Sequence, residues 1–200
     1  MTLEITSAPP VYGLVLSGGA SRRMQHDKAL IDYHGETQLR WTYQLLASLL
    51  SRVFVSVRDD QRDDAARREF PQIADIYSDV GPAAGILSAQ ALYPDVAWLV
   101  VACDLPRLNE ATLRRLLEAR DPARDATAFI SSHDGLPEPL CALWEPSSHA
   151  NLLARVASGK PCPRKTLIQG DTLLLSPYAA DALDNINTPE ELANLRASLS

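Results

Sequence analysis

The sequence is poor in cysteine and in the patterns that make cysteine or histidine a metal ligand. Its three cysteines, Cys103, Cys141 and Cys162, are odd in number, widely spaced and without a Cys-x-x-Cys pair. They therefore predict neither a disulfide framework nor a zinc site. The four histidines likewise show no metal-ligand spacing.

The chain also lacks excess positive charge and long apolar runs. Its net charge of −6 and pI of about 5.2 argue against DNA, RNA or anionic membranes as partners, because binding them requires a basic surface. No apolar run of about 18 residues is present, and residues 1–10 lack the basic start and apolar core of a signal peptide. We therefore expect a cytoplasmic protein with no nucleic-acid or membrane partner.

No linker rich in proline, serine or glycine divides the 200 residues, of which 46% are hydrophobic. We expect one domain over residues 1–200, with residues 1–10 as a flexible lead. Strand-like and helix-like segments alternate, which favours an α/β fold with parallel strands. The expected strands are 11–16, 53–57, 73–77, 97–103, 126–131 and 140–144. The expected helices begin at Thr37, Ile86, Asn109 and Ser147, with a charged surface helix over 59–70 and an extended piece over 29–33.

The stretch from Val11 to Lys28 joins an apolar strand to a glycine turn and a group of cations. The run Val11–Leu16 stops at Ser17-Gly18-Gly19, and Arg22, Arg23 and Lys28 follow. Glycine amides can turn together toward an anion, and fixed cations neutralise a polyphosphate. The alternative is an ordinary turn before a solvated charged face, since neither the G-x-G-x-x-G nor the P-loop spacing occurs.

A second apolar run, residues 97–103, ends at Asp104. Its lack of alternation predicts a central strand of a parallel sheet, and ligands bind at the carboxyl ends of such strands. A carboxylate beside a triphosphate requires a cation between them, and Mg²⁺ binds one or two carboxylates together with phosphate oxygens. The alternative is that Asp104 caps a helix or starts a turn before Pro106. We expect Cys103 to be a small buried hydrophobe rather than a nucleophile.

The motif at residues 16–28 resembles the L-A-G-G-x-S-x-R-M-G-x-D-K signature of the molybdenum cofactor guanylyltransferases. It departs from that signature at Ser17, where alanine is usual, and at Gln25, where glycine is usual. Three later segments resemble the same family in the same order: Gly81-Pro82-Ala83-Ala84-Gly85, Cys103-Asp104-Leu105-Pro106, and Asn185-Ile186-Asn187-Thr188-Pro189-Glu190-Glu191-Leu192. The resemblance spans nearly the whole chain.

The resemblance implies a single-domain, three-layer Rossmann-like sandwich with a mostly parallel central sheet. It also implies Mg²⁺-dependent transfer of GMP from GTP to the terminal phosphate of molybdopterin, giving molybdopterin guanine dinucleotide and pyrophosphate. Transient contact with proteins that deliver or receive the cofactor would accompany this activity. The guanine preference depends on the glycine pair of the loop and on Asp27-Lys28.

The resemblance further implies three groups of site residues. The catalytic group is Arg23, Lys28 and Asp104, of which Asp104 is also the metal ligand. The nucleotide-binding group is Leu16, Ser17, Gly18, Gly19, Lys28, Ser56, Asp79, Gly81 and Asp104. Asn185 and Asn187 are expected near the acceptor or the metal.

Several alternatives remain open at this point. Asp79 has the composition of an ordinary turn or cap, and the basic cluster Lys160, Arg164 and Lys165 is either a contact for an acceptor phosphate or a solvated face. By resemblance, residues 137–140 lie near the acceptor. The activity itself has two rivals: a cytidylyl- or sugar-phosphate nucleotidyltransferase, and a nucleotide-binding module without catalysis.

Overall fold

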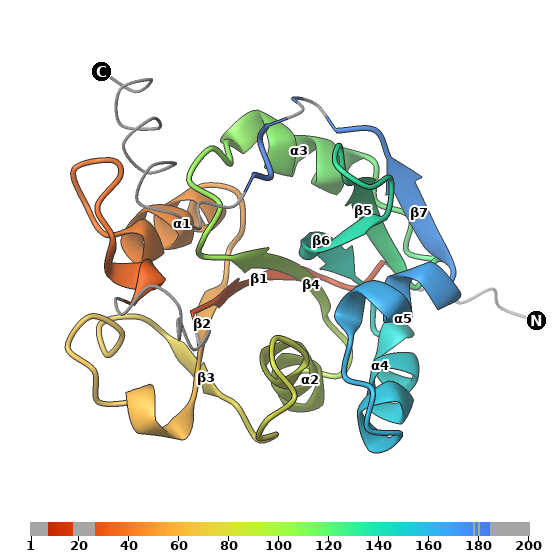
Figure 1. The fold of residues 1–200 in the computed structure, drawn as a ribbon, viewed down its shortest axis with the longest axis horizontal. Helices are drawn as coiled ribbons and strands as arrows, with labels where there is room; N and C mark the ends of the chain where they lie inside the picture. The colour runs from red at the N-terminus through yellow and green to blue at the C-terminus, as the bar shows by residue number, and fades with distance from the viewer. Residues whose placement is uncertain (1–7, 18–26, 178, 180, 185–200) are drawn as a thin grey trace, which may run out of the picture.

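The structure, a computed structural model, describes residues 8–17, 27–177, 179 and 181–184. These residues form a seven-stranded sheet with strand order β3-β2-β1-β4-β6-β5-β7 (Figure 1). The strands are β1 (Val11–Leu16), β2 (Val53–Val57), β3 (Gln72–Ala74), β4 (Ala97–Ala102), β5 (Ala126–Ile130), β6 (Pro137–Trp144) and β7 (Thr172–Leu175). The helices are α1 (Gln38–Ala47), α2 (Ala83–Leu92), α3 (Glu110–Glu118), α4 (Ser148–Ala157) and α5 (Pro163–Gln169), with short 3₁₀ turns η1 (Lys28–Leu30) and η2 (Asp59–Gln61).

Most neighbouring strands of this sheet are parallel. β3, β2, β1 and β4 run in one direction, and β7 runs parallel to β5. Of the described strands, only β6 runs against its neighbours, β4 and β5. The predicted α/β class with a mostly parallel central sheet is therefore confirmed.

Helices cover both faces of the sheet and make a three-layer sandwich (Figure 1). α1 and α3 lie on one face, and α2, α4 and α5 lie on the other. Successive side chains of a strand point to opposite faces, so Val15 packs in the core beneath α1 while Leu14 and Leu16 pack in the core beneath α2. β4 is buried along its whole length, as expected for a strand covered on both sides.

Two helix starts follow the predicted capping chemistry. The Thr37 side chain accepts a hydrogen bond from the Arg40 amide, and Asn109 accepts one from the Thr112 amide at 2.9 Å. Each satisfies an amide that the first helical turn leaves without an intrahelical partner. None of the helices in the described part of the chain has the length and apolar content of a bilayer span.

One local prediction is correct only in part, and another is wrong. Of the expected extended piece 29–33, Ala29 and Leu30 belong to the 3₁₀ turn η1, which begins where Asp27 accepts a hydrogen bond from the Ala29 amide, whereas Ile31 is extended and Asp32 forms an isolated bridge with Thr37. Residues 59–70 are not a surface helix: only the short turn η2 forms, and irregular turns follow. The physical reason is that Arg67 is wholly buried and bonds to distant segments, which a solvated helix would not permit.

Other differences concern boundaries and missed elements. α2 begins at Ala83 rather than Ile86, and β6 begins at Pro137 rather than Leu140. α5 and β7 carry too weak a pattern in the sequence to have been predicted. β7 is only partly buried at the edge of the sheet, so it shows neither a continuous apolar run nor a regular alternation.

Candidate active site

The carboxyl ends of four parallel strands meet at one edge of the sheet. Leu16, the last residue of β1, lies beside Ser56 of β2 on one side and Ala102 of β4 on the other. β3 ends at Ala74, level with the end of β2. Loops that leave such an edge are where ligands bind in open α/β sheets. Several of the predicted site residues therefore come from one edge.

Lys28 and Asp104 meet at this edge from distant parts of the sequence. The Lys28 Nζ lies 3.6 Å from an Asp104 carboxylate oxygen, and their side chains are 18% and 26% exposed. A second contact joins the same two segments, since the His34 Nε2–H donates to the Pro106 carbonyl oxygen at 3.0 Å. The structure thus brings together two of the three predicted catalytic residues as a partly buried pair of opposite charges.

Ser17, which departs from the alanine usual in the family signature, ties β1 to β2. Its hydroxyl is buried and donates to the Ser56 carbonyl oxygen at 2.9 Å. Alanine has no hydroxyl and could not make this bond, so the serine at position 17 adds a link between β1 and β2.

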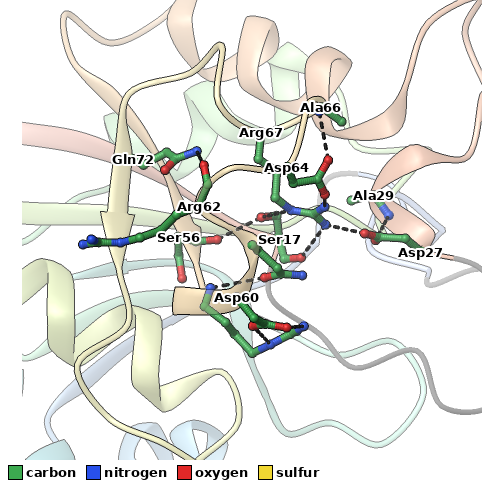
Figure 2. A network of polar contacts seen from close by, with 12 residues as sticks. Ser17, Asp27, Ala29, Ser56, Asp60, Arg62, Asp64, Ala66, Arg67 and Gln72 are labelled. Atoms are coloured by element: carbon green, nitrogen blue, oxygen red, sulfur yellow. Dashed lines mark hydrogen bonds and ion pairs between the residues drawn. The ribbon is translucent and has the colours of Figure 1, made fainter.

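Arg67 is the site residue that sequence reasoning missed most clearly. Its side chain is fully buried, and Figure 2 shows it reaching both Ser17 and Asp27. Nε donates to the Ser17 hydroxyl at 3.2 Å, and Nη2 donates to the Ser17 carbonyl oxygen at 3.1 Å and to Asp27 at 2.6 Å. Nη1 pairs with Asp64. No local pattern marks this arginine, because it sits among charged residues that resemble a solvated face.

Asp75 is a second missed residue, and it lies directly after β3. Its carboxylate accepts a hydrogen bond from the Ser56 hydroxyl at 2.7 Å. Burial raises the pKa of Asp75, and the Ser56 hydrogen bond opposes that rise. The sequence placed Asp75 inside the expected strand 73–77, whereas β3 ends at Ala74 and leaves Asp75 directly after it. Asp79, selected by resemblance, is exposed and has a positive φ of 58°, and its role in nucleotide binding stays a prediction.

Two glycines shape the connection from β3 to α2. Gly81 has a φ of 61°, which glycine adopts without strain. Gly85 lies in the first turns of α2, where an added Cβ would lie 2.3 Å from the Ser56 Oγ and 2.7 Å from Leu16 Cδ2. The missing side chain lets α2 pack directly against the ends of β1 and β2. Gly85 therefore borders the ends of β1 and β2 through contact, and the role of Gly81 in nucleotide binding stays a prediction.

Cys103 has the properties of a structural residue. It is buried, and burial together with the neighbouring Asp104 charge raises its thiol pKa to about 12. A thiol with this pKa is almost wholly protonated near neutral pH and is a poor nucleophile. The prediction of a small buried hydrophobe agrees with this environment.

The remaining half of the sheet carries charged pairs at the same edge. Because β6 runs against β4, its first residues, Pro137 and Glu138, lie toward the end of β4 that precedes Asp104. Arg164 pairs with Glu138 at 3.0 Å and with Asp134 at 2.7 Å. These two carboxylates neutralise the cation that the sequence offered as a phosphate contact.

A small hollow lies beside this part of the sheet. It is lined by Ser131, His133, Glu138 and Asp184, among others, and His133 contacts Asp184 at 2.8 Å. The hollow connects the turn between β5 and β6 with the last part of the chain that the structure describes. The expected position of residues 137–140 near the acceptor stays a prediction.

Some predicted site residues lie outside the described part of the chain. These are Gly18, Gly19 and Arg23 in the first loop, and Asn185 and Asn187 near the carboxyl terminus. Their assigned roles stay predictions. Leu16, Ser17, Lys28, Ser56 and Asp104 are described and lie at the shared edge, together with the unpredicted Arg67 and Asp75.

Asp104 is better suited to Mg²⁺ than to a metal ion that is held by protein side chains alone. Over the ranges that the structure describes, no group of three or more His, Cys, Asp or Glu side chains could hold a metal ion. A resident, all-protein metal cage is therefore not built from these residues. A single partly exposed carboxylate suits Mg²⁺, which keeps several waters and takes its other oxygens from bound phosphates.

Sequence comparison finds relatives over nearly the whole chain. Residues 13–173 match the family described as MobA-like NTP transferase domain. A molybdenum cofactor guanylyltransferase of Pseudomonas aeruginosa is 32% identical over 195 residues, covering 96% of this chain and 97% of that protein. A molybdenum cofactor biosynthesis bifunctional protein of Synechocystis is 37% identical over 94% of this chain, which spans only 54% of that longer protein.

Solved structures share the fold. Molybdopterin-guanine dinucleotide biosynthesis protein A from Archaeoglobus fulgidus superposes with a TM-score of 0.78 at 23% identity, over 94% of this chain and 98% of that one. A 4-diphosphocytidyl-2C-methyl-D-erythritol synthase from Anaerococcus prevotii gives 0.70 at 12% identity, over 96% of both chains. Through the family match and the Pseudomonas relative, this chain belongs to the MobA-like NTP transferases and is a nucleotidyltransferase.

Proposed function

We propose that this nucleotidyltransferase transfers GMP from GTP to the terminal phosphate of molybdopterin, with Mg²⁺ as the cofactor. The products are molybdopterin guanine dinucleotide and pyrophosphate. The observation that carries the proposal is the Lys28–Asp104 pair at the strand edge, at 3.6 Å, in a chain 32% identical to a protein named molybdenum cofactor guanylyltransferase.

The chemistry needs positioning and charge neutralisation rather than a strong base. An oxygen of the acceptor phosphate attacks the α-phosphorus of GTP, and the bond from that phosphorus to the bridging oxygen of pyrophosphate breaks. The attacking phosphate is already anionic near neutral pH, so no side chain has to remove its proton. The reaction therefore does not call for a histidine or an activated thiol beside Asp104, and the protonated Cys103 is not required.

Individual residues then have distinct tasks. Lys28 would neutralise negative charge on the pyrophosphate as it departs, which is the main way proteins accelerate phosphoryl and nucleotidyl transfer. Asp104 would hold Mg²⁺, and the bound ion would neutralise phosphate charge. Ser56 and Asp75, joined by their 2.7 Å hydrogen bond, would contact the nucleoside from the ends of β2 and β3.

The experiment incubates purified protein with molybdopterin, Mg²⁺ and either GTP or CTP, and measures pyrophosphate release together with the mass of the dinucleotide product. We expect turnover with GTP and little with CTP. A preference for CTP would instead support a cytidylyltransferase. Tight GTP binding without turnover on molybdopterin or on sugar phosphates would support a non-catalytic module. The Asp104→Asn variant serves as the inactive control.

A further inference from the structure

We infer that Arg67 is a positioning residue for the polyphosphate part of the nucleotide site. This inference rests on the proposed function only in that it assumes a nucleoside triphosphate ligand. Arg67 is not placed in contact with substrate. It acts through the two chain segments that it joins, one ending at Ser17 and the other beginning at Asp27.

Both side chains and backbone hold the Arg67 guanidinium in place. The guanidinium is fully buried, and four hydrogen bonds hold it: one to the Ser17 hydroxyl, one to the Ser17 carbonyl oxygen, one to Asp27 and one to Asp64. A guanidinium presents its donors in a planar fork, so partners bound to it are fixed in direction as well as in distance. Figure 2 shows this fork pointing toward Ser17 and Asp27.

The charge balance also favours a fixed arrangement. A buried cation is unfavourable unless carboxylates and hydrogen bonds compensate for its lost hydration. Asp27 and Asp64 supply two carboxylates, each only about one-third exposed. Movement of Asp27 away from Arg67 would leave a buried charge short of a partner. Asp27 is therefore held near Ser17 by a strong electrostatic restraint.

The contacts of Arg67 matter for the site because they lie next to β1 and next to Lys28. Ser17 directly follows β1, and Asp27 immediately precedes Lys28, so Arg67 ties the residue before Lys28 to the end of β1. The Ser17 hydroxyl passes the restraint on to β2 through its bond to the Ser56 carbonyl oxygen. On the other flank, Lys28 reaches Asp104 at 3.6 Å. Arg67 thus sets where Lys28 stands relative to the ends of β1 and β2.

Such a restraint matters most for the triphosphate. Donors that are already in place bind a polyphosphate without losing further conformational entropy on binding. The nucleoside contacts are expected from the Ser56 hydroxyl and the Asp75 carboxylate, which bond to each other, whereas the Arg67 network reaches only the Ser56 backbone carbonyl through Ser17. Loss of the guanidinium fork should therefore weaken binding of polyphosphates more than binding of a monophosphate.

The experiment compares Arg67→Lys and Arg67→Gln with the wild type, using calorimetry in Mg²⁺ with GTP, inorganic pyrophosphate and GMP as probes. We expect GTP and pyrophosphate to bind about tenfold more weakly, a change that corresponds to one well-formed charged hydrogen bond. GMP affinity should change by less than about twofold, which is below the value of such a bond. In steady-state assays the KM for GTP should rise while the KM for the acceptor stays constant.

Arg120→Lys is the matched control for a purely structural role. Arg120 is also a largely buried arginine, and it forms a two-point pair with Glu145 at 2.6 and 2.8 Å. It lies just beyond α3 and donates to the Pro9 carbonyl oxygen, which precedes β1 at the opposite end of that strand from Ser17. Both lysine variants should lower the melting temperature, but only Arg67→Lys should lower the ratio of GTP to GMP affinity. If that ratio is unchanged in Arg67→Lys, the inference is overturned.

If Arg67→Gln does not fold, Arg67→Lys and Ser17→Ala still test the inference. Ser17→Ala removes the hydroxyl that accepts from Nε but keeps the carbonyl oxygen, and it should lower the same ratio by a smaller factor. Unchanged GTP and pyrophosphate affinity in both variants overturns the inference. A wild-type protein that binds pyrophosphate and CTP but not GTP overturns the proposed guanine specificity alone, and the Arg67 comparison then proceeds with CTP and CMP.

Discussion

The Lys28 ammonium lies 3.6 Å from the Asp104 carboxylate, although Lys28 follows β1 in the sequence and Asp104 follows β4. Without ligand, each charge partly neutralises the other. A bound triphosphate and its counter-cation would compete for both groups, because the lysine attracts phosphate oxygens and the carboxylate attracts the cation. Under the proposed function, the pair would therefore separate when the triphosphate and Mg²⁺ bind.

Replacement of Asp104 by asparagine should reduce turnover by at least about 100-fold while the fold is retained, because the variant loses the charge that binds a cation but keeps the side-chain shape. Pyrophosphate release over a Mg²⁺ titration measures the loss, and thermal unfolding checks the fold. Full Mg²⁺-dependent turnover in the folded variant would contradict the assigned role.

Replacement of Lys28 by methionine should raise the KM for GTP and lower kcat, since the cation is expected to act on both the bound and the departing phosphates. The double variant with Asp104→Asn should be less impaired than the product of the two single effects predicts. Residues that act on the same charged group are not independent. Multiplicative effects would show that the two side chains act separately.

Replacement of Asp75 by asparagine should stabilise the protein near neutral pH. Burial raises the pKa of the folded Asp75 above its ordinary value of 3.8, so the folded state holds the proton more tightly than the unfolded state. The free energy of unfolding therefore falls as the pH rises from about 3.8 through the folded pKa, and then stays level. The introduced amide does not titrate, and its oxygen can still accept the Ser56 hydrogen bond.

The measurement for Asp75 is denaturant unfolding of wild type and variant across acidic and neutral pH. The stability gain of Asp75→Asn should be largest above the folded pKa and should shrink as the pH falls toward 3.8. GTP affinity should fall in the same variant if the carboxylate contacts the nucleoside. A variant that is less stable than wild type at neutral pH would refute the destabilising effect of the buried charge.

Replacement of Gly85 by alanine should destabilise the protein by about 1–3 kcal/mol, the usual effect of forcing a methyl group into a packed core. The new Cβ would approach the Ser56 Oγ to 2.3 Å and Leu16 Cδ2 to 2.7 Å. Adding Ser56→Ala removes the first of these two collisions, so the double variant should regain part of the lost stability. Equal stability of Gly85→Ala and wild type would show that α2 shifts freely.

Titration of thiols tests the structural role of Cys103. Burial raises the pKa of Cys103 and of Cys141 to about 12, whereas Cys162 is partly exposed. At pH 8 an aromatic disulfide reagent should react with about one thiol per native chain and with all three after unfolding. Cys103→Ser should retain catalytic activity. A rapidly reacting Cys103 would revive a nucleophilic role.

The sequence predicted the central architecture because the relevant signals are local. Continuous apolar runs marked β1 and β4, and the carboxylate directly after the second run marked Asp104. The carboxyl ends of parallel strands share an edge, so Asp104 was expected near the loop after β1. The 3.6 Å contact with Lys28 agrees with that reasoning.

Arg67 and Asp75 could not be found in the same way. The charged composition of residues 59–70 predicted a solvated helix, but the decisive interactions of Arg67 are with Ser17 and Asp27, far away in sequence. Such partners are fixed by tertiary packing, which overrides local propensity. Asp75 lay inside the expected strand 73–77, because the apolar and aromatic residues Ile76 and Tyr77 extended the pattern beyond the true end of β3 at Ala74.

The reversed direction of β6 has a further consequence for how such an enzyme can diversify. Its connection to β5 emerges at the same rim as Asp104, yet it belongs to a hairpin whose strands lie beyond the parallel half of the sheet. Residues can be gained or lost in that hairpin tip without displacing β1, β2 or β3. Under the proposed function, a change of acceptor would then require changes at this hairpin tip alone, while the strands expected to hold the nucleotide stay unchanged.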